Sequence, residues 1–235
     1  MRAMSMGTLV GQGHCLTCPI RPSSLFGCLK ESELSLIEDF QTRVIKFETG
    51  DIIYNEGESL GLIYTLRAGH IKLTKFNNEG NAQIVRLVRP GDLFGYEKLI
   101  SSGTYMHTAE ALEPIELCQL SVEKLNHLRD QSGAINQAII ERALQQVMKT
   151  EDHLTQVGLL KSKPRLAWFL LQWVGNATEA VSFPISRRDL AQYLGLTIET
   201  ISRHTAEWKR QGIISESKNL LTISDRDALQ AIANS

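Results

Sequence analysis

The central part of the chain, residues 43–121, alternates short apolar runs with glycine-bearing turns. The runs are rich in β-branched and aromatic residues and read VIKF, IIYN, LIYTL, IKLTKF and QIVRLV. The turns between them read TGD, EGES, RAGH, NNEGN and RPGD. The segment AEALEPIELCQLS has the pattern of the last strands. Short strands at regular spacing with glycine-rich turns predict an antiparallel barrel or sandwich.

Helical spacing appears on both sides of this region. Residues 30–40 have apolar positions three apart and predict a short helix, and residues 122–160 predict a long one of about 58 Å if it is continuous. In the long segment a stripe alternates four and three apart: Ile140, Leu144, Val147, Glu151, Leu154 and Gly158. Such a stripe favours pairing with a second copy of the helix, the alternative being packing on the protein's own domains. Glu151 on this stripe costs stability unless it is neutralised or faces water.

After a predicted hinge at KSKP (161–164) and a helix over 165–174, the chain reads ISRRDLAQYLGLTIETISRHTAEWKRQGII (185–214). Ser186, followed by Asp189, predicts the cap of a first helix that ends at Gly195. Thr197 predicts the cap of a second helix that runs to about Gln211, with Gly212 as its stop. Two short helices joined by a tight turn are typical of a helix–turn–helix, and IISESKNLLTI beyond them predicts a hairpin, as in a winged helix.

The second helix of this motif has distinct faces. The spacing predicts a buried stripe of Ile198, Ile201, Thr205 and Trp208. Glu199, Ser202 and Arg203 share another face near the start of the helix, where a recognition helix contacts base edges in the major groove. His204, Lys209 and Arg210 are predicted to contact DNA phosphates. The alternative is a surface helix with an internal Glu–Arg pair.

Composition adds three constraints. The 235 residues, 43% hydrophobic and 22% charged, are typical of a globular protein of two units. The C-terminal part, from Lys161 on, carries ten Lys or Arg against seven Asp or Glu, which suits a nucleic-acid partner. No apolar run suggests a membrane span and the N-terminus has no signal-peptide pattern, so we expect a cytoplasmic protein. Catalytic motifs are missing and the histidines are scattered, so we expect no enzyme.

The cysteines are unevenly distributed. Three of the four lie in CLTCPIRPSSLFGC (15–28), and the fourth is Cys118. In the cytoplasm such a group indicates metal or redox chemistry rather than a structural disulfide. Four thiolates suit a [4Fe–4S] cluster. The alternatives are a zinc site, a thiol–disulfide switch using Cys15 and Cys18, and a Cys118 that is simply buried.

The sequence TIETISR after RRDLAQYLGL resembles the DNA-binding motif of the CRP/FNR transcription regulators, specifically the FNR branch, and the resemblance covers nearly the whole chain. It implies an α+β fold with a cyclic-nucleotide-binding-like β-roll (jelly-roll), a long dimerisation helix and a winged helix–turn–helix. The implied boundaries are 1–32 for the cysteine segment, 33–121 for the roll, 122–163 for the dimerisation helix and hinge, and 164–235 for the DNA-binding domain. It also implies a homodimer, a palindrome of TTGAT half-sites read by Glu199, Ser202 and Arg203, and contact with RNA polymerase.

The resemblance also bears on the signal. Cyclic-nucleotide-binding relatives have an Arg-Ser pair for the phosphate where this chain has Met106 and His107, so we expect no cyclic nucleotide. FNR-type proteins hold a [4Fe–4S] cluster with three N-terminal cysteines and one in a context like ALEPIELC, which implies Cys15, Cys18, Cys28 and Cys118 as ligands. The nine residues between Cys18 and Cys28 are more than in FNR, so Cys28 is the least secure ligand. The implied signal is oxygen, with nitric oxide or another oxidant as the alternative.

Overall fold

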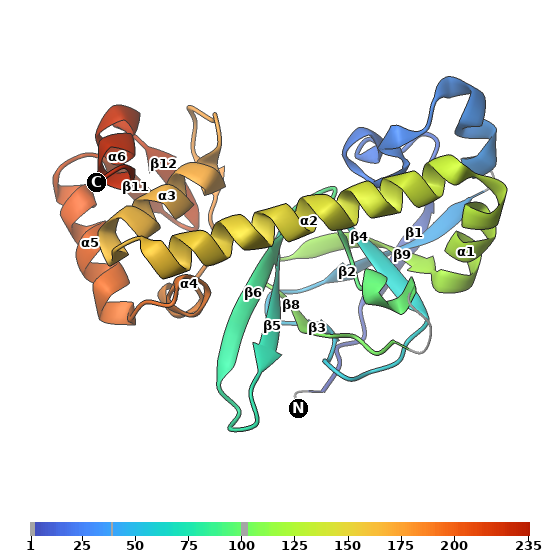
Figure 1. The fold of residues 1–235 in the computed structure, drawn as a ribbon, viewed down its shortest axis with the longest axis horizontal. Helices are drawn as coiled ribbons and strands as arrows, with labels where there is room; N and C mark the ends of the chain where they lie inside the picture. Colours follow the sequence, from blue (N-terminus) through green and yellow to red (C-terminus); the bar gives the residue numbers. More distant parts are fainter. Residues whose placement is uncertain (1–2, 39, 100–102) are drawn as a thin grey trace. The chain divides into compact units, whose positions relative to one another are not determined.

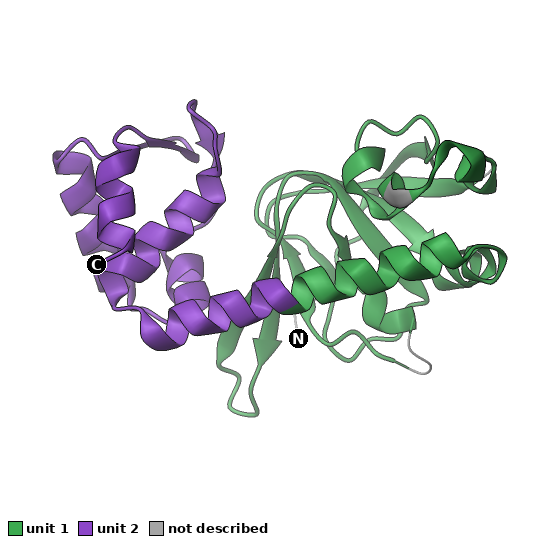
Figure 2. Cartoon of the chain, turned by 45° about the horizontal axis from the view of Figure 1, so that its top comes forward, with its two compact units in different colours: residues 1–147 green, residues 148–235 purple. Residues whose placement is uncertain are grey.

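The structure is a computed structural model that describes residues 3–38, 40–99 and 103–235. The chain divides into two compact units, Met1–Val147 and Met148–Ser235, each described here by itself (Figure 2). Helix α2 (Gly133–Leu159) contains the boundary between them. Within the described ranges, none of the helices is both long and apolar enough to cross a membrane.

The first unit is the predicted β-roll, built from two antiparallel sheets (Figure 1). In the described residues the five-stranded sheet has the order β1-β2-β9-β4-β7, and the four-stranded sheet has the order β3-β8-β5-β6. The strands are β1 (Thr8–His14), β2 (Gln41–Phe47), β3 (Ile52–Tyr54), β4 (Leu62–Ala68), β5 (Ile71–Phe76), β6 (Ala82–Val88), β7 (Leu93–Phe94), β8 (Thr108–Ala111) and β9 (Ile115–Ser121).

Buried and exposed side chains alternate along the strands, so that one face of each sheet packs against the other sheet. In β2, Thr42, Val44 and Phe47 are buried and the residues between them are wholly or partly exposed. Between the sheets lies a group of stacked rings, in which Tyr54 and Tyr105 are 3.8 Å apart between ring centroids. Buried aromatic pairs of this kind contribute packing energy beyond the area that they bury.

Strand β1 was not expected from the sequence, because TLVGQGH contains two glycines and its apolar residues are exposed. It pairs antiparallel with β2 at the edge of the five-stranded sheet, with an irregularity between Leu9 and Gly11. This pairing attaches the cysteine segment to the roll. The segment continues as short 3-10 helices: η1 (Arg21–Ser23), η2 (Leu25–Cys28) and η3 (Glu31–Ile37). The helix predicted over 30–40 is therefore η3, and a further 3-10 helix, η4 (Tyr96–Leu99), follows β7.

The continuous helix predicted over 122–160 is wrong. The structure has α1 (Val122–Gln131) and α2, separated by Ser132 in an extended conformation. The Ser132 hydroxyl accepts a hydrogen bond from the backbone N–H of Ala134 at 3.2 Å, as a helix N-cap does. The side chain of Asn136 also donates to the carbonyl of Arg129 at 3.1 Å, which fixes the bend. The 27 residues of α2 extend about 40 Å instead of 58 Å.

The second unit, considered from Met148 on, is the predicted winged helix–turn–helix. Its elements after α2 are α3 (Ser162–Val174), β10 (Val181–Ser182), α4 (Arg187–Leu194), α5 (Ile198–Arg210), β11 (Ile214–Ser217), β12 (Leu220–Ile223) and α6 (Arg226–Ala233). Of the segment predicted as a hinge (161–164), only Lys161 precedes a helix: Ser162 begins α3 and Pro164 lies in its first turn. Proline is tolerated there because the first N–H groups of a helix have no partner inside it. Strand β10 and helix α6, which packs on α3, were not predicted.

Candidate functional site

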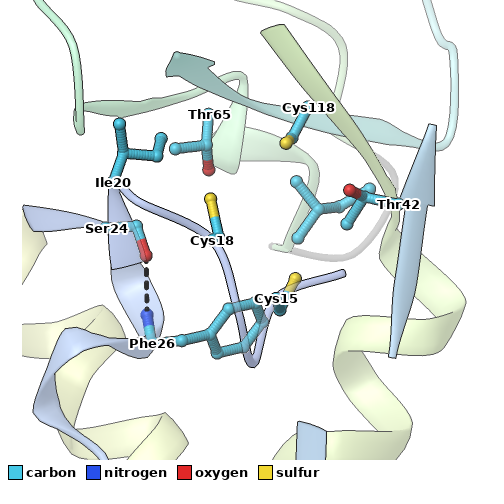
Figure 3. A pocket seen from close by; sticks show the side chains of 9 residues that line it. Cys15, Cys18, Ile20, Ser24, Phe26, Thr42, Thr65 and Cys118 are labelled. Atoms are coloured by element: carbon cyan, nitrogen blue, oxygen red, sulfur yellow. Dashed lines mark hydrogen bonds between the residues drawn. The ribbon is translucent and has the colours of Figure 1, made fainter. Parts of the chain in front are cut away.

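Three of the predicted cysteine ligands meet at one small pocket inside the first unit (Figure 3). Cys15 follows the last residue of β1, and Cys18 comes after a turn in which its N–H donates to the carbonyl of Cys15. Cys118 lies in β9, in register with Val44 of β2 and with Thr65 of β4. Because β1, β2 and β9 are successive neighbours in one sheet, residues about a hundred positions apart in the sequence come together here.

The pocket wall is mostly apolar, with three buried residues that carry hydroxyl groups, Ser24, Thr42 and Thr65. Its other lining residues are Ile20, Ser24, Phe26, Thr42, Thr65 and Leu120. Cys15 and Cys118 are buried, and Cys18 is partly exposed. A Cβ atom at Gly13 would lie 2.8 Å from Thr42 Oγ1 and 3.7 Å from Cys118 Sγ, so β1 approaches the thiols this closely only with glycine there.

The pKa of the Cys15 thiol is raised to about 12, chiefly by burial and in the same direction by the nearby sulfurs of Cys118 and Cys18, while the charge of Arg67 opposes the shift. Burial also raises the pKa of Cys118, while a hydrogen bond from Thr42 and the charge of Arg67 oppose the shift. Thiolates are therefore disfavoured in this pocket unless a cation neutralises them. Iron or zinc would supply that charge, so the donor set suits a thiolate-bound metal group.

A zinc ion and an iron–sulfur cluster require different spacings of their thiolate ligands. Among the residues that the structure describes, no three His, Cys, Asp or Glu side chains are close enough to hold one metal ion. Four thiolates around a single zinc ion lie about 3.8 Å apart, since Zn–S bonds are about 2.3 Å long and tetrahedral. In an iron–sulfur cluster each thiolate binds a different iron atom, so the ligands stand further apart. The three thiols that line the pocket are candidate ligands for a thiolate-bound group, and the choice between zinc and a cluster stays a prediction.

Cys28 ends η2, but its side chain lies outside the described residues. Its role as the fourth ligand stays a prediction. Sequence reasoning also missed Thr42 and Thr65 beside Cys118. Only the strand register brings these hydroxyl groups to the sulfur, and no local sequence signal could have indicated them.

The second candidate site is the pair of helices α4 and α5, whose predicted caps are confirmed. The Ser186 hydroxyl accepts from the N–H of Asp189 at 3.0 Å, and Thr197 accepts from the N–H of Thr200 at 3.2 Å. Gly195 lies between the helices in the left-handed conformation, with φ of 62°. Glycine adopts this conformation without the strain that a Cβ atom brings, which allows the tight turn.

The faces of α5 mostly agree with the prediction. Ile201, Thr205 and Trp208 are buried, and the predicted base-reading residues Glu199, Ser202 and Arg203 are exposed. The backbone N–H of Glu199 and the Thr197 hydroxyl lower the pKa of the Glu199 carboxyl. Glu199 is therefore an ionised hydrogen-bond acceptor at neutral pH, which is the form that accepts from cytosine N4. Contact of these residues with bases stays a prediction.

Two predictions for α5 need correction. Ile198, the first residue of the helix, is 44% exposed and not buried. His204 is 7% exposed, so its ring cannot reach a phosphate. Its Nε2 is 3.1 Å from the hydroxyl of Ser162, and its ring stacks on Trp208. His204 therefore packs inside the domain.

Lys209 and Arg210 are exposed at the end of α5, as phosphate contacts must be. Lys209 Nζ also lies 3.6 Å from a carboxylate oxygen of Glu216 in strand β11. The same Glu216 carboxylate forms an ion pair with Arg187 of α4. Glu216 thus connects the wing to both helices of the motif. The phosphate contacts themselves stay predictions.

The third feature is an apolar stripe on α2. Ile140, Leu144, Val147 and Leu154 are 52–70% exposed, and Glu151 and Gly158 are exposed between and beyond them. Met148 and Leu159 extend the exposed apolar surface and were not in the predicted set. Contiguous apolar surface of this kind marks an interaction site. Its use as a dimer interface stays a prediction.

Comparison with known proteins identifies both parts of the chain. The Crp-like helix-turn-helix domain matches residues 164–232, and the cyclic nucleotide-binding domain matches residues 44–132. The chain is 30% identical over 228 residues to the nitrogen fixation regulation protein FixK of Bradyrhizobium diazoefficiens, with 94% of each chain covered. It is 27% identical over 226 residues to the fumarate and nitrate reduction regulatory protein of Escherichia coli, covering 94% of this chain and 90% of the other.

Among solved structures, FixK2 from Bradyrhizobium japonicum superposes with a TM-score of 0.74 at 25% identity. The match covers 81% of this chain and 96% of FixK2. The similarity to these relatives therefore includes both the roll and the winged helix–turn–helix, in the same order.

Proposed function

Because the chain belongs to the CRP/FNR family of transcription regulators, we propose that it senses oxygen or redox state through a [4Fe–4S] cluster. Like the other members of this family it is a DNA-binding transcription regulator and not an enzyme. The observation that carries the finer proposal is the convergence of three thiols, from β9 and from the segment after β1, on one pocket. The name of the Escherichia coli relative, which refers to fumarate and nitrate reduction, supports a role in respiration without oxygen.

In this proposal Cys15, Cys18, Cys28 and Cys118 hold the cluster, which supplies reactivity toward oxygen when it is bound. The chain's own residues exclude water from the site through Phe26 and the other apolar wall residues. In this proposal cyclic nucleotide is not the signal. The presence of Met106 and His107, rather than an arginine that could bind a phosphate, supports this, and His107 pairs with Glu97 at 3.1 Å.

The thiol pocket has a physical connection to the dimerisation helix. Cys15 and Cys118 belong to the same buried apolar cluster as Leu125 and Leu128 of α1 and Ile135 and Ala138 of α2. Arg142 of α2 also donates a hydrogen bond, 3.0 Å long, to the carbonyl of Ser24, which lines the pocket. A change in the cysteine segment would therefore act directly on α2.

We further propose that two copies pair along α2 and bind a palindrome of TTGAT half-sites in the cytoplasm. Glu199, Ser202 and Arg203 read the bases, and Lys209 and Arg210 contact phosphates. Contact with RNA polymerase would follow at promoters that the protein activates. The exposed stripe on α2 and the exposed start of α5 support this proposal.

The test is anaerobic purification followed by iron, sulfide and visible-absorption measurements before and after air is admitted. We expect about four irons and four sulfides per chain and a visible band that changes in air. Cys118→Ser should lose iron, whereas Thr74→Ser, in a strand of the other sheet, should not. Arg142→Leu should keep iron but lessen the difference in dimerisation between the cluster-loaded and cluster-free protein. If the wild-type protein contains zinc and no iron, the zinc site would replace the cluster in this proposal. If it contains no iron and forms a Cys15–Cys18 disulfide after oxidation, the thiol–disulfide switch would replace it.

A further inference from the structure

The joint between the end of α2 and the helix–turn–helix contains an arginine that bonds to both. Arg165, in the first turn of α3, donates through Nη2 to the carbonyl of Leu160 at 2.6 Å. Through Nη1 it donates to the carbonyl of Leu194 at 2.8 Å, and the carbonyl of Gly195 lies 3.5 Å from the same atom. Leu160 directly follows α2, and Leu194 is the last residue of α4.

These carbonyls are ones that a helix end leaves without an intrahelical partner. They also carry the partial negative charge of the helix C-terminus, which a guanidinium neutralises. Because the guanidinium is planar and its donors are fixed in a fork, it sets the distance and the angle between the two helix ends. A lysine has a single ammonium group on a flexible chain and would hold them less firmly.

Two further contacts fasten the same helix ends. His153 of α2 stacks on Tyr193 of α4, with ring centroids 4.1 Å apart and planes 14° apart. A Cβ atom at Gly195 would lie 3.5 Å from Val157 of α2 and 3.7 Å from Nη1 of Arg165, so the turn lies directly on the last turns of α2. The turn leads within three residues to α5.

We propose that Arg165 is a positioning residue that fixes the angle of the recognition helix on the end of α2, and thereby the half-site spacing that the dimer accepts. In a dimer paired along α2, the two copies of α5 enter major grooves about one turn of DNA apart. Adding one base pair moves a half-site by about 3.4 Å and rotates it by about 35°. A joint held rigidly by Arg165 cannot follow that change, so the dimer binds well only to sites with one half-site spacing. The inference rests on dimeric DNA binding and not on the cluster.

The experiment is selection of binding sites from random DNA by the full-length protein, prepared anaerobically, with the spacing between half-sites read from the recovered sequences. Wild-type protein should recover one spacing. Arg165→Leu should recover the same half-site sequence at several spacings, so that its preference over a spacing changed by one base pair falls at least about fivefold. Arg165→Lys should give an intermediate spread. Arg226→Leu, at an exposed arginine of α6, is the matched control and should keep one spacing.

The preference among spacings separates positioning from a general loss of structure. A merely destabilised domain would bind all spacings more weakly and would keep the wild-type preference among them. If Arg165→Leu does not fold, His153→Leu, which removes the stack on Tyr193 from the other side, tests the same joint. A single wild-type spacing in Arg165→Leu, or in His153→Leu if Arg165→Leu does not fold, would overturn the proposal. Failure to find iron in the wild-type protein would affect the proposed signal only.

Discussion

At the scale of single residues, burial decides which cysteines and histidines can react. Cys15 and Cys118 are buried and have raised pKa values, whereas Cys18 is partly exposed. The thiolate is the form that alkylating reagents attack, and it must also be accessible. The pocket therefore gives its three thiols different reactivities.

We predict that iodoacetamide at pH 8 modifies Cys18 at least about tenfold faster than Cys15 or Cys118 in reduced, metal-free protein. Peptide mass spectrometry over a time course measures the three rates. Equal rates would mean that the pocket opens in the absence of a bound group, and denaturant, which exposes all thiols, serves as the control.

His204 and Arg210 should respond differently to removal, because one is buried and the other is exposed. His204→Ala removes the bond to Ser162 and the stack on Trp208, and we expect a loss of about 1–3 kcal/mol in the free energy of unfolding. Arg210→Ala should change the free energy of unfolding by no more than about 0.5 kcal/mol. It should reduce the slope of log binding constant against log salt concentration by about one. Urea unfolding and binding titrations at several salt concentrations measure the two effects. If His204→Ala also reduced the salt dependence of DNA binding, His204 would contact a phosphate after all, as the sequence predicted.

His204 and His153 predict that the stability of the protein depends on pH. Burial lowers the pKa of His204 and of His153, and the nearby charges of Arg203 and Arg165, respectively, act in the same direction. Between the unfolded value of about 6.5 and the lower folded values, the unfolded chain binds more protons than the folded one. Stability is therefore complete above about pH 6.5 and is lost as the pH falls through that window. Urea midpoints between pH 7.5 and 5 should fall less steeply in a His153→Gln, His204→Gln double variant than in wild type.

At the scale of elements, local signals decide where helices and strands begin and end. Ser186, Gly195 and Thr197 were identified as caps because each acts within one turn of its own helix. The break at Ser132 was missed although the residue is also a good cap, because the hydrophobic spacing runs through it. Strand β1 was missed because a glycine-rich edge strand depends on its partner β2 for its structure.

The wing turn between β11 and β12 offers an element-scale prediction. Lys218 and Asn219 both have positive φ values, 46° and 63°, as in the turn type that favours Asn-Gly. Replacing them by Asn and Gly should stabilise the protein by about 1 kcal/mol, because a lysine in this conformation is strained. Lys218→Gln is the matched control, since it removes the charge and keeps the strain. Thermal unfolding should show a rise of a few degrees for the first variant and none for the control.

At the scale of the whole molecule, the exposed stripe on α2 is predicted to control the equilibrium between monomer and dimer. Leu144→Glu would bury a charge against the second helix and should weaken the dimer at least about tenfold. Glu151→Ala should strengthen the dimer of the metal-free protein, because it removes a carboxylate from the stripe. Analytical ultracentrifugation measures both, with Gln145→Glu as a control outside the predicted seam. An unchanged dissociation constant for Glu151→Ala would mean that this carboxylate faces water in the dimer.

The sequence by itself determined the order of the roll, the helices and the winged helix–turn–helix, the caps of α4 and α5, and the exposed face of Glu199, Ser202 and Arg203. These features depend on periodicity and capping, which act over one or two turns and are visible in a short stretch. Only the tertiary structure decided the bend at Ser132, the burial of His204, the threonines beside Cys118 and the role of Arg165 between two helix ends. Each of these depends on a partner from another element, which strand register and packing bring near.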